Sequence, residues 1–309
     1  MAPIAIEQPQ LDNIIPKDIK GDNRYGIFDK KGSDLKSMAV GATKDGRTLV
    51  PVLPEFKTKE EQQLYAKQHL VAAFRVSRIM VMMRALQDIC PFATLFAAII
   101  SGSILKTTNS YAMHFADICV SDLVLVNENA EIVEGEHAVN AAGFAIHSEI
   151  HKAHPWINAV CHAHTVAGKA YSTFGKPLPP IMQDSLRFYD SHVVNTEYAG
   201  VVLSSDEGKT IAKLLRRQDK VAILQNHGLL LVGETIDEAA YWFVCFDKCC
   251  KAQLMIDAAS AGTGYQPKLV DHETATFTAK NSGARYRGWL NFQPYYTNMV
   301  KKTKGEFLK

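Results

Sequence analysis

Two short apolar segments, residues 157–164 and 221–232, limit the folds that are open to this chain of 309 residues. Both are rich in Val, Ile, Leu or Ala and are interrupted or bounded by turn-forming residues, a pattern that predicts buried β-strands. Apolar residues at helical spacing occur over residues 140–153, before the first segment, and over residues 235–259, after the second. Strands and helices therefore alternate along the chain, which indicates an α/β fold.

The first part of the chain differs from the rest. Residues 1–56 are polar, contain scattered Gly and Pro residues and show little periodicity, so we expect an extended arm there. Thr58 and Glu61 form a capping-box signal, and a helical pattern runs from Glu60 to about Leu86. We therefore divide the chain into an N-terminal arm, residues 1–56, and a folded domain, residues 57–309.

Within the folded domain, the sequence pattern between the first helix and residue 140 is less regular. Residues 92–105 are apolar without clear alternation, so helix and strand both fit them. Residues 122–126 have the pattern of a strand, and a polar turn separates them from a second short strand at residues 131–133. These two strands predict a hairpin.

The composition excludes several classes of partner. Lys and Arg number 34 against 32 Asp and Glu, and the net charge of +2 is too small to indicate nucleic acid or a membrane surface as an obligatory partner. Residues 1–17 lack the pattern of a secretory signal, and no run of about 18 apolar residues could span a membrane. The six cysteines include no C-x-x-C pair, so we expect reduced thiols. A cytoplasmic protein that binds a small molecule fits these observations.

Three histidines at the ends of the apolar segments predict a divalent-metal site. His162 and His164 alternate in a strand, so both side chains project from the same face. His227 lies between two apolar runs, beside Gly228, which permits a tight turn. Three neutral imidazoles suit Zn²⁺ with a fourth position open for water or substrate, although Fe²⁺, Co²⁺ and Mn²⁺ also fit. Ordinary packing of buried histidines is the alternative.

A second group of histidines follows helical spacing. His147, His151 and His154 are separated as i, i+4 and i+7, a pattern that is typical of an exposed polar stripe. We expect His151 and His154 to be part of such a stripe.

The motifs around the metal-site histidines resemble those of the class II aldolase/adducin family, closest to its fungal, adducin-like branch. The resemblance extends from about Leu70 to the C-terminus, and its most specific stretches are Gly143-Phe-Ala-Ile-His-Ser, Pro155-Trp-Ile-Asn-Ala-Val-Cys-His-Ala-His and Ile223-Leu-Gln-Asn-His-Gly-Leu-Leu-Leu-Val-Gly. It implies a three-layer α/β/α sandwich around a mainly antiparallel central sheet. It also implies a homotetramer with active sites at subunit interfaces, and zinc ligands at His162, His164 and His227.

The sequence departs from the sugar-phosphate aldolases of this family at two places. Their Ser-Ser-Glu segment, which holds phosphate and supplies an acid/base, corresponds here to Ala141, Ala142 and Gly143. The Gly-rich hairpin that adds phosphate contacts is shortened, with residues 102–106 running quickly into 108–115. A phosphate cradle needs amides and donors at set positions, so we expect a substrate without phosphate.

Because Gly143 offers no acid/base side chain, another group must transfer the proton in an aldolase-like reaction. His147 lies one helical turn beyond Gly143 on the same face and is our candidate for this role, although a packed histidine fits as well. Asp184 and Tyr189 follow the His-x-His strand in a polar loop and are further catalytic candidates. Ordinary turn chemistry accounts for Asp184 equally.

These observations lead to three hypotheses for function. The first is a metal-dependent lyase or isomerase, with Zn²⁺ or alternatively Fe²⁺, that acts on a non-phosphorylated carbonyl compound, such as a tailoring step in secondary metabolism. The second is a catalytically silent, adducin-like assembly module. The third is an Fe(II) oxygenase on the same scaffold. The C-terminal tail is basic but short, which favours an enzyme over a cytoskeletal module.

Overall fold

An eight-stranded sheet forms the centre of the part of the chain that the structure describes. The structure is a computed structural model, and it describes residues 54, 56–82, 95–99, 106–108, 113–198, 200 and 205–309. The strand order is β4-β3-β2-β1-β5-β8-β7-β6, and every neighbouring pair is antiparallel except β6 and β7. The strands are β1 Leu95–Ile99, β2 Lys106–Thr108, β3 Val124–Val126, β4 Ile132–Glu134, β5 Ala159–Ala163, β6 His192–Asn195, β7 Val221–Leu224 and β8 Gly228–Gly233.

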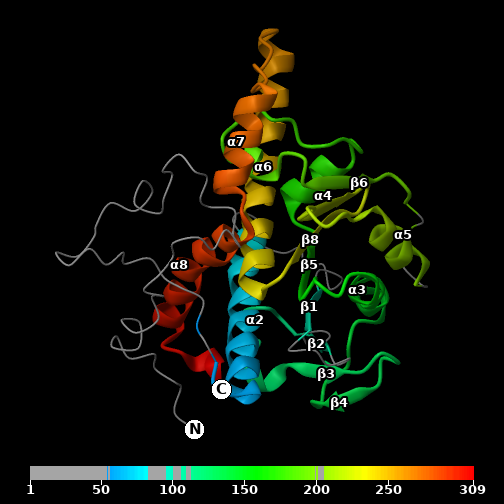
Figure 1. The fold of residues 1–309 in the computed structure, drawn as a ribbon, viewed down its shortest axis with the longest axis vertical. Coiled ribbons are helices and arrows are strands. Elements are labelled where there is room, and N and C mark those ends of the chain that lie inside the picture. The colour runs from blue at the N-terminus through cyan, green and yellow to red at the C-terminus, as the bar shows by residue number, and fades with distance from the viewer. Residues whose placement is uncertain are drawn as a thin grey trace, which may run out of the picture.

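Helices cover both faces of this sheet, as Figure 1 shows. They are α2 Lys59–Met82, α3 Ala141–Ala153, α4 Val166–Ser172, α5 Asp206–Leu214, α6 Ile236–Thr263, α7 His272–Ser282 and α8 Arg285–Thr303, with short 3₁₀ turns η3 Val120–Asp122, η4 Ser185–Phe188 and η5 Glu306–Leu308. None of the helices described combines the length and the apolar character that crossing a bilayer requires.

The alternation of side chains in the inner strands separates two apolar cores. Cys161 and Leu231 pack with buried residues of α2, α4, α6 and α8 on one face of the sheet. Val160 and Leu230, their neighbours along β5 and β8, pack with residues of α3 and α5 on the other face. The expected three-layer α/β/α sandwich around a mainly antiparallel sheet is confirmed.

Most elements expected from the sequence are present. Thr58 Oγ1 accepts from the Glu61 amide at 3.1 Å at the start of α2, while the Glu61 carboxylate accepts from the Lys57 amide at 2.9 Å. The stretch whose pattern was ambiguous, residues 92–105, contains a strand, β1. The predicted arm, residues 1–56, lies outside the described residues except for Pro54 and Phe56, so the division into arm and domain stays a prediction.

The C-terminal helices were not expected. Helix α7 packs against the short turn η4, and α8 then packs along α6 and α2. Gly288 and Pro294 both lie inside α8 and argue locally against a helix. Burial of Trp289 and Phe292 favours the helix nevertheless, because tertiary packing outweighs local propensity.

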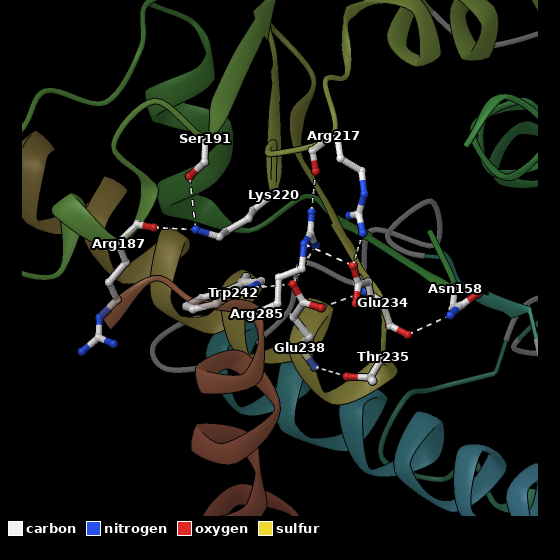
Figure 2. Close-up of polar contacts among 10 residues, drawn as sticks. All are labelled: Asn158, Arg187, Ser191, Arg217, Lys220, Glu234, Thr235, Glu238, Trp242 and Arg285. Carbon is white, nitrogen blue, oxygen red and sulfur yellow. Dashed lines mark hydrogen bonds and ion pairs between the residues drawn. The ribbon is translucent and has the colours of Figure 1, made fainter. Parts of the chain in front are cut away.

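A buried polar junction, composed of Lys220, Glu238 and Arg285 with their partners, ties α8 to the sheet and α6 (Figure 2). The Arg285 guanidinium donates to Glu238 Oε1 at 2.8 Å and to the Arg217 carbonyl at 2.8 Å. Trp242 Nε1 donates to the same Glu238 oxygen at 3.1 Å. One carboxylate on α6 therefore holds the first turn of α8 in place.

Candidate metal centre

His162, His164 and His227 converge where β5 meets the turn between β7 and β8. The Nε2 atoms of His162 and His164 are 3.1 Å apart. The three ring centroids lie 4.8 to 5.0 Å from one another. Within the described part of the chain, no other group of three or more His, Cys, Asp or Glu side chains could hold a metal ion, and the ligand atoms of this triad all lie within 4.8 Å of each other.

The sheet brings the triad together. In the β5–β8 register His162 pairs with Leu230, and His164 follows the last residue of β5. His227 enters from the turn between β7 and β8, where Asn226 and Gly228 have positive φ of 59° and 151°. A Cβ at Gly228 would lie 3.2 Å from the Ala163 carbonyl oxygen, so the turn approaches β5 as closely as a glycine allows.

Backbone and carboxylate partners fix two of the imidazoles. His162 Nδ1 lies 2.9 Å from the Leu229 carbonyl oxygen, which can only accept, so Nδ1 carries the proton. His227 Nδ1 lies 3.3 Å from Glu207 Oε1 on α5, and an ionised carboxylate likewise accepts. Both rings are thereby left with an unprotonated Nε2, the form that binds a metal.

Burial favours the neutral form of His162 and His164. Desolvation lowers the pKa of His162 well below its ordinary value, and the neighbouring His227 and His164 lower it further. Burial and then His227 lower the pKa of His164 to about 4. Two nitrogens on one tetrahedral zinc ion are about 3.3 Å apart, given Zn–N distances of about 2.0–2.1 Å. The separation of 3.1 Å between His162 and His164 fits such an ion.

A buried hydrogen-bond pair follows the triad. Thr165, directly after His164, caps α4 by accepting from the Gly168 amide at 3.1 Å. Its hydroxyl donates to Asp247 on α6, whose carboxylate also accepts from the Gly168 amide at 3.2 Å. Burial raises the pKa of Asp247. Helix α6 thus fixes the chain where it leaves the metal-binding strand.

His147 lies on α3, the helix that covers the sheet face from which His162 projects. Its side chain is buried in α3 on the same face of the sheet as His162, and it is close enough to lower the pKa of His162. The expected exposed stripe is wrong for its neighbours: His151 is buried and donates from Nδ1 to the Ile157 carbonyl at 2.9 Å, and His154 Nε2 contacts the Ala212 carbonyl oxygen at 2.7 Å. These rings face the sheet and α5 because α3 is covered by α5.

Asp184 and Tyr189 make their contacts away from the triad. Asp184 Oδ1 accepts from Arg187 Nε at 3.1 Å, and the Tyr189 hydroxyl contacts His272 Nδ1 at 2.9 Å. Tyr189 precedes the start of β6, whereas His227 follows the end of the parallel strand β7, so the two lie at opposite ends of this strand pair. A catalytic role for Asp184 or Tyr189 stays a prediction, and it would require contact with the site of another subunit.

The first turn of α3 carries none of the groups that hold phosphate in sugar-phosphate aldolases. Asn140 caps the helix, and its side-chain oxygen accepts from the Gly143 amide at 3.2 Å. Ala141 and Ala142 present methyl groups. Glu207, which contacts His227, could not be predicted from the sequence, because a carboxylate 20 residues before a histidine gives no local signal.

Comparisons with known proteins find a matching family profile and several similar proteins. The profile of the Class II Aldolase and Adducin N-terminal domain matches residues 97–254. The chain is similar to the decarboxylase NovR of Streptomyces niveus, with 44% identity over 189 residues that cover 61% of this chain and 68% of that protein. It is equally similar, at 44% over 189 residues, to the 4-hydroxy-3-prenylphenylpyruvate oxygenase/4-hydroxy-3-prenylbenzoate synthase of Streptomyces roseochromogenus subsp. oscitans, covering 61% of this chain and 66% of that protein.

A solved structure has the same fold over most of the chain. The L-fuculose 1-phosphate aldolase from Glaciozyma antarctica PI12 superposes with a TM-score of 0.73 and 35% sequence identity, covering 84% of this chain and 97% of that one.

Proposed function

The chain belongs to the class II aldolase and adducin family, and from this premise we propose that it is a metal-dependent lyase that breaks a C–C bond beside a carbonyl group in a substrate without phosphate. The observation on which the proposal rests is the convergence of three imidazoles, two of which have Nδ1 next to an acceptor. Three imidazoles at this spacing suit a divalent ion.

His162, His164 and His227 would hold this ion, Zn²⁺ or alternatively Fe²⁺. When bound, it supplies Lewis-acid chemistry, which polarises a substrate carbonyl and stabilises negative charge on the adjacent carbon. His147 is the candidate for proton transfer, since it is buried on the helix that covers this face of the sheet and its charge would lower the pKa of His162.

The substrate class follows from what the first turn of α3 lacks. Ala141 and Ala142 offer no hydroxyl, and the Gly143 amide already donates a hydrogen bond to the Asn140 side chain. The phosphate contacts that the Glaciozyma enzyme's name implies would therefore be missing here. The names of the two Streptomyces relatives point instead to decarboxylation and to a phenylpyruvate, a 2-oxo acid. We take a non-phosphorylated 2-oxo acid of secondary metabolism as the class to test.

An Fe(II) oxygenase is the second candidate. The relative whose name includes an oxygenase activity is 44% identical, and three imidazoles hold Fe²⁺ as well as Zn²⁺. Oxygen uptake with ferrous iron and a 4-hydroxyphenylpyruvate-type acid, absent with zinc, would favour the oxygenase over the lyase.

The proposal extends to assembly and location. A homotetramer in the cytoplasm, acting on a small molecule, fits the family and the thiols, since Cys119, Cys161, Cys245, Cys249 and Cys250 are free in the described residues. Sedimentation velocity on tag-free protein tests the tetramer.

The first experiment is elemental analysis by mass spectrometry on tag-free, chelator-washed protein. We expect about one zinc or iron per chain in the wild type, lost in His162→Ala and His227→Ala. The matched control is His137→Ala, an exposed histidine outside the triad, which should keep its metal. A wild type without metal would contradict the lyase and favour a silent, adducin-like module.

If metal is present, the loaded protein is given L-fuculose 1-phosphate in one assay and a 2-oxo acid in another. Turnover of the sugar phosphate alone would contradict the proposed substrate class.

A further inference from the structure

Glu207, on α5, lies against the Nδ1 nitrogen of His227. We infer that Glu207 is a positioning residue that orients the His227 imidazole and fixes its tautomer for metal binding. This inference rests on the proposed function, because it concerns the same metal site. It assigns a role to a residue on α5 that neither the motifs nor the spacing of the histidines indicates.

The geometry separates this role from direct ligation. Glu207 Oε1 is 3.3 Å from His227 Nδ1, and only 10% of the Glu207 side chain and 15% of the His227 side chain are exposed. The group of side chains that could hold an ion contains the three histidines and not Glu207. The carboxylate therefore contacts Nδ1 and leaves Nε2 of His227 for the ion, as carboxylates commonly do beside metal-binding histidines.

His227 needs such a partner more than His162 does. His162 is fixed by the paired strand β5, and the Leu229 carbonyl holds its Nδ1. His227 comes from a turn whose flanking residues, Asn226 and Gly228, both have positive φ. A turn fixes the backbone but leaves the ring free to rotate. The Glu207 carboxylate therefore gives His227 Nδ1 an acceptor that fixes the ring, as the Leu229 carbonyl does for His162.

Close packing of α5 on α3 sets the position of Glu207. A Cβ at Gly208, the next residue, would lie 2.8 Å from the Ala145 carbonyl oxygen and 3.0 Å from Ile146 Cα. Because only glycine permits this approach, the first turn of α5 rests directly on α3. Glu207 is thereby held at the edge of the metal site instead of facing solvent.

The competing explanation is that Glu207 merely stabilises α5, since acidic residues are favourable in the first turn of a helix. Asp206 shares that turn but is exposed, with 80% of its side chain accessible. Asp206→Asn therefore removes the same charge from the same helix end without touching His227, and serves as the matched control.

The test measures Co²⁺ affinity, by competition with a chromophoric chelator at one pH, for the wild type, Glu207→Ala, Glu207→Gln and Asp206→Asn. We expect Glu207→Ala to weaken Co²⁺ binding by about 10- to 100-fold, with Glu207→Gln at the lower end because its amide oxygen still accepts from Nδ1. Asp206→Asn should bind as the wild type does. The Co²⁺ absorption spectrum of Glu207→Ala should also change, since the ligand field depends on ring orientation.

Several outcomes would overturn the inference. Glu207→Ala and Glu207→Gln could both bind Co²⁺ within about twofold of a wild type that binds it, or Asp206→Asn could lose as much affinity as they do. If Glu207→Ala does not fold, the isosteric Glu207→Gln decides alone. A wild type that binds no Co²⁺ would overturn the proposed function and this inference together. If the wild type binds Co²⁺ and the Glu207 variants bind it equally well, only this inference fails.

Discussion

At the scale of single residues, the metal site depends on how the chain is held immediately after His164. Thr165 is buried, and its hydroxyl links Asp247 on α6 to the first turn of α4. Replacing it by valine keeps the shape but removes both the cap and the donor to a buried carboxylate. We expect Thr165→Val to lower the free energy of unfolding by about 1–3 kcal/mol, measured by guanidinium denaturation.

Thr173→Val is the control for this prediction, because the Thr173 hydroxyl is exposed and donates to the Ala170 carbonyl at 2.7 Å within the last turn of the same helix. Its effect should stay within about 0.5 kcal/mol. Equal losses in the two variants would show that the link to Asp247 contributes nothing to stability.

At the scale of elements, the contact between α3 and α5 can be tested with a single methyl group. Alanine normally stabilises a helix over glycine by about 0.5–1 kcal/mol. At Gly208 the new Cβ would clash with the Ala145 carbonyl and the Ile146 backbone. We expect Gly208→Ala instead to cost about 1–3 kcal/mol of unfolding free energy in chemical denaturation.

Gly262→Ala is the matched control, since Gly262 also lies in a helix, α6, and a Cβ there meets nothing within 4 Å. It should stabilise the protein slightly. If Gly208→Ala is as stable as Gly262→Ala, the two helices are not packed as tightly as the structure has them.

Local periodicity explains which elements could be predicted from the sequence. The strands on either side of His227 and the pairing of His162 with His164 follow from patterns within a few residues, and both are present. Helix α8 could not be predicted, because Pro294 argues against it and only packing on α6 and α2 favours it. Glu207 could not be predicted for the same reason: its contact with His227 exists only once α5 rests on α3.

At the scale of the whole molecule, an ion held by the triad would join successive strands of the sheet that are distant in the sequence, since β5 and the β7–β8 turn both contribute ligands. A ligand that binds only the folded state stabilises it by about 2.7 kcal/mol at 100 times its Kd. We expect removal of metal with a chelator to lower the unfolding temperature of the wild type. The unfolding temperature of His162→Ala should not change when the chelator is added. A decrease in this variant would mean that the stabilising ion binds at another site.

The junction around Lys220 makes the stability of the molecule depend on pH. Lys220 Nζ donates to the Arg187 carbonyl at 2.8 Å and to Ser191 Oγ at 3.3 Å, and lies 5.1 Å from the centre of the Trp242 ring (Figure 2). Burial is the main cause that lowers the pKa of Lys220 to about 7 from its ordinary value of 10.5. Nearby Arg285 lowers it too, whereas Glu238 opposes the shift.

The sign of the effect follows from proton counting. Between pH 7 and 10.5 the unfolded chain carries a proton on Lys220 that the folded chain lacks, so the unfolding free energy rises with pH, by at most about 1.4 kcal/mol per pH unit. Below pH 7 Lys220 is protonated in both the folded and the unfolded chain, so its contribution to the unfolding free energy no longer changes with pH.

Lys220→Met removes this proton while filling a similar volume. We therefore expect the unfolding free energy of the wild type, minus that of Lys220→Met, to increase from pH 8 to 10 in denaturant titrations. Lys268→Met, at an exposed lysine, should give a difference from the wild type that does not change over this range. Parallel curves for the wild type and Lys220→Met would mean that Lys220 stays charged in the folded protein, with the carboxylate of Glu238 and the ring of Trp242 compensating for its burial.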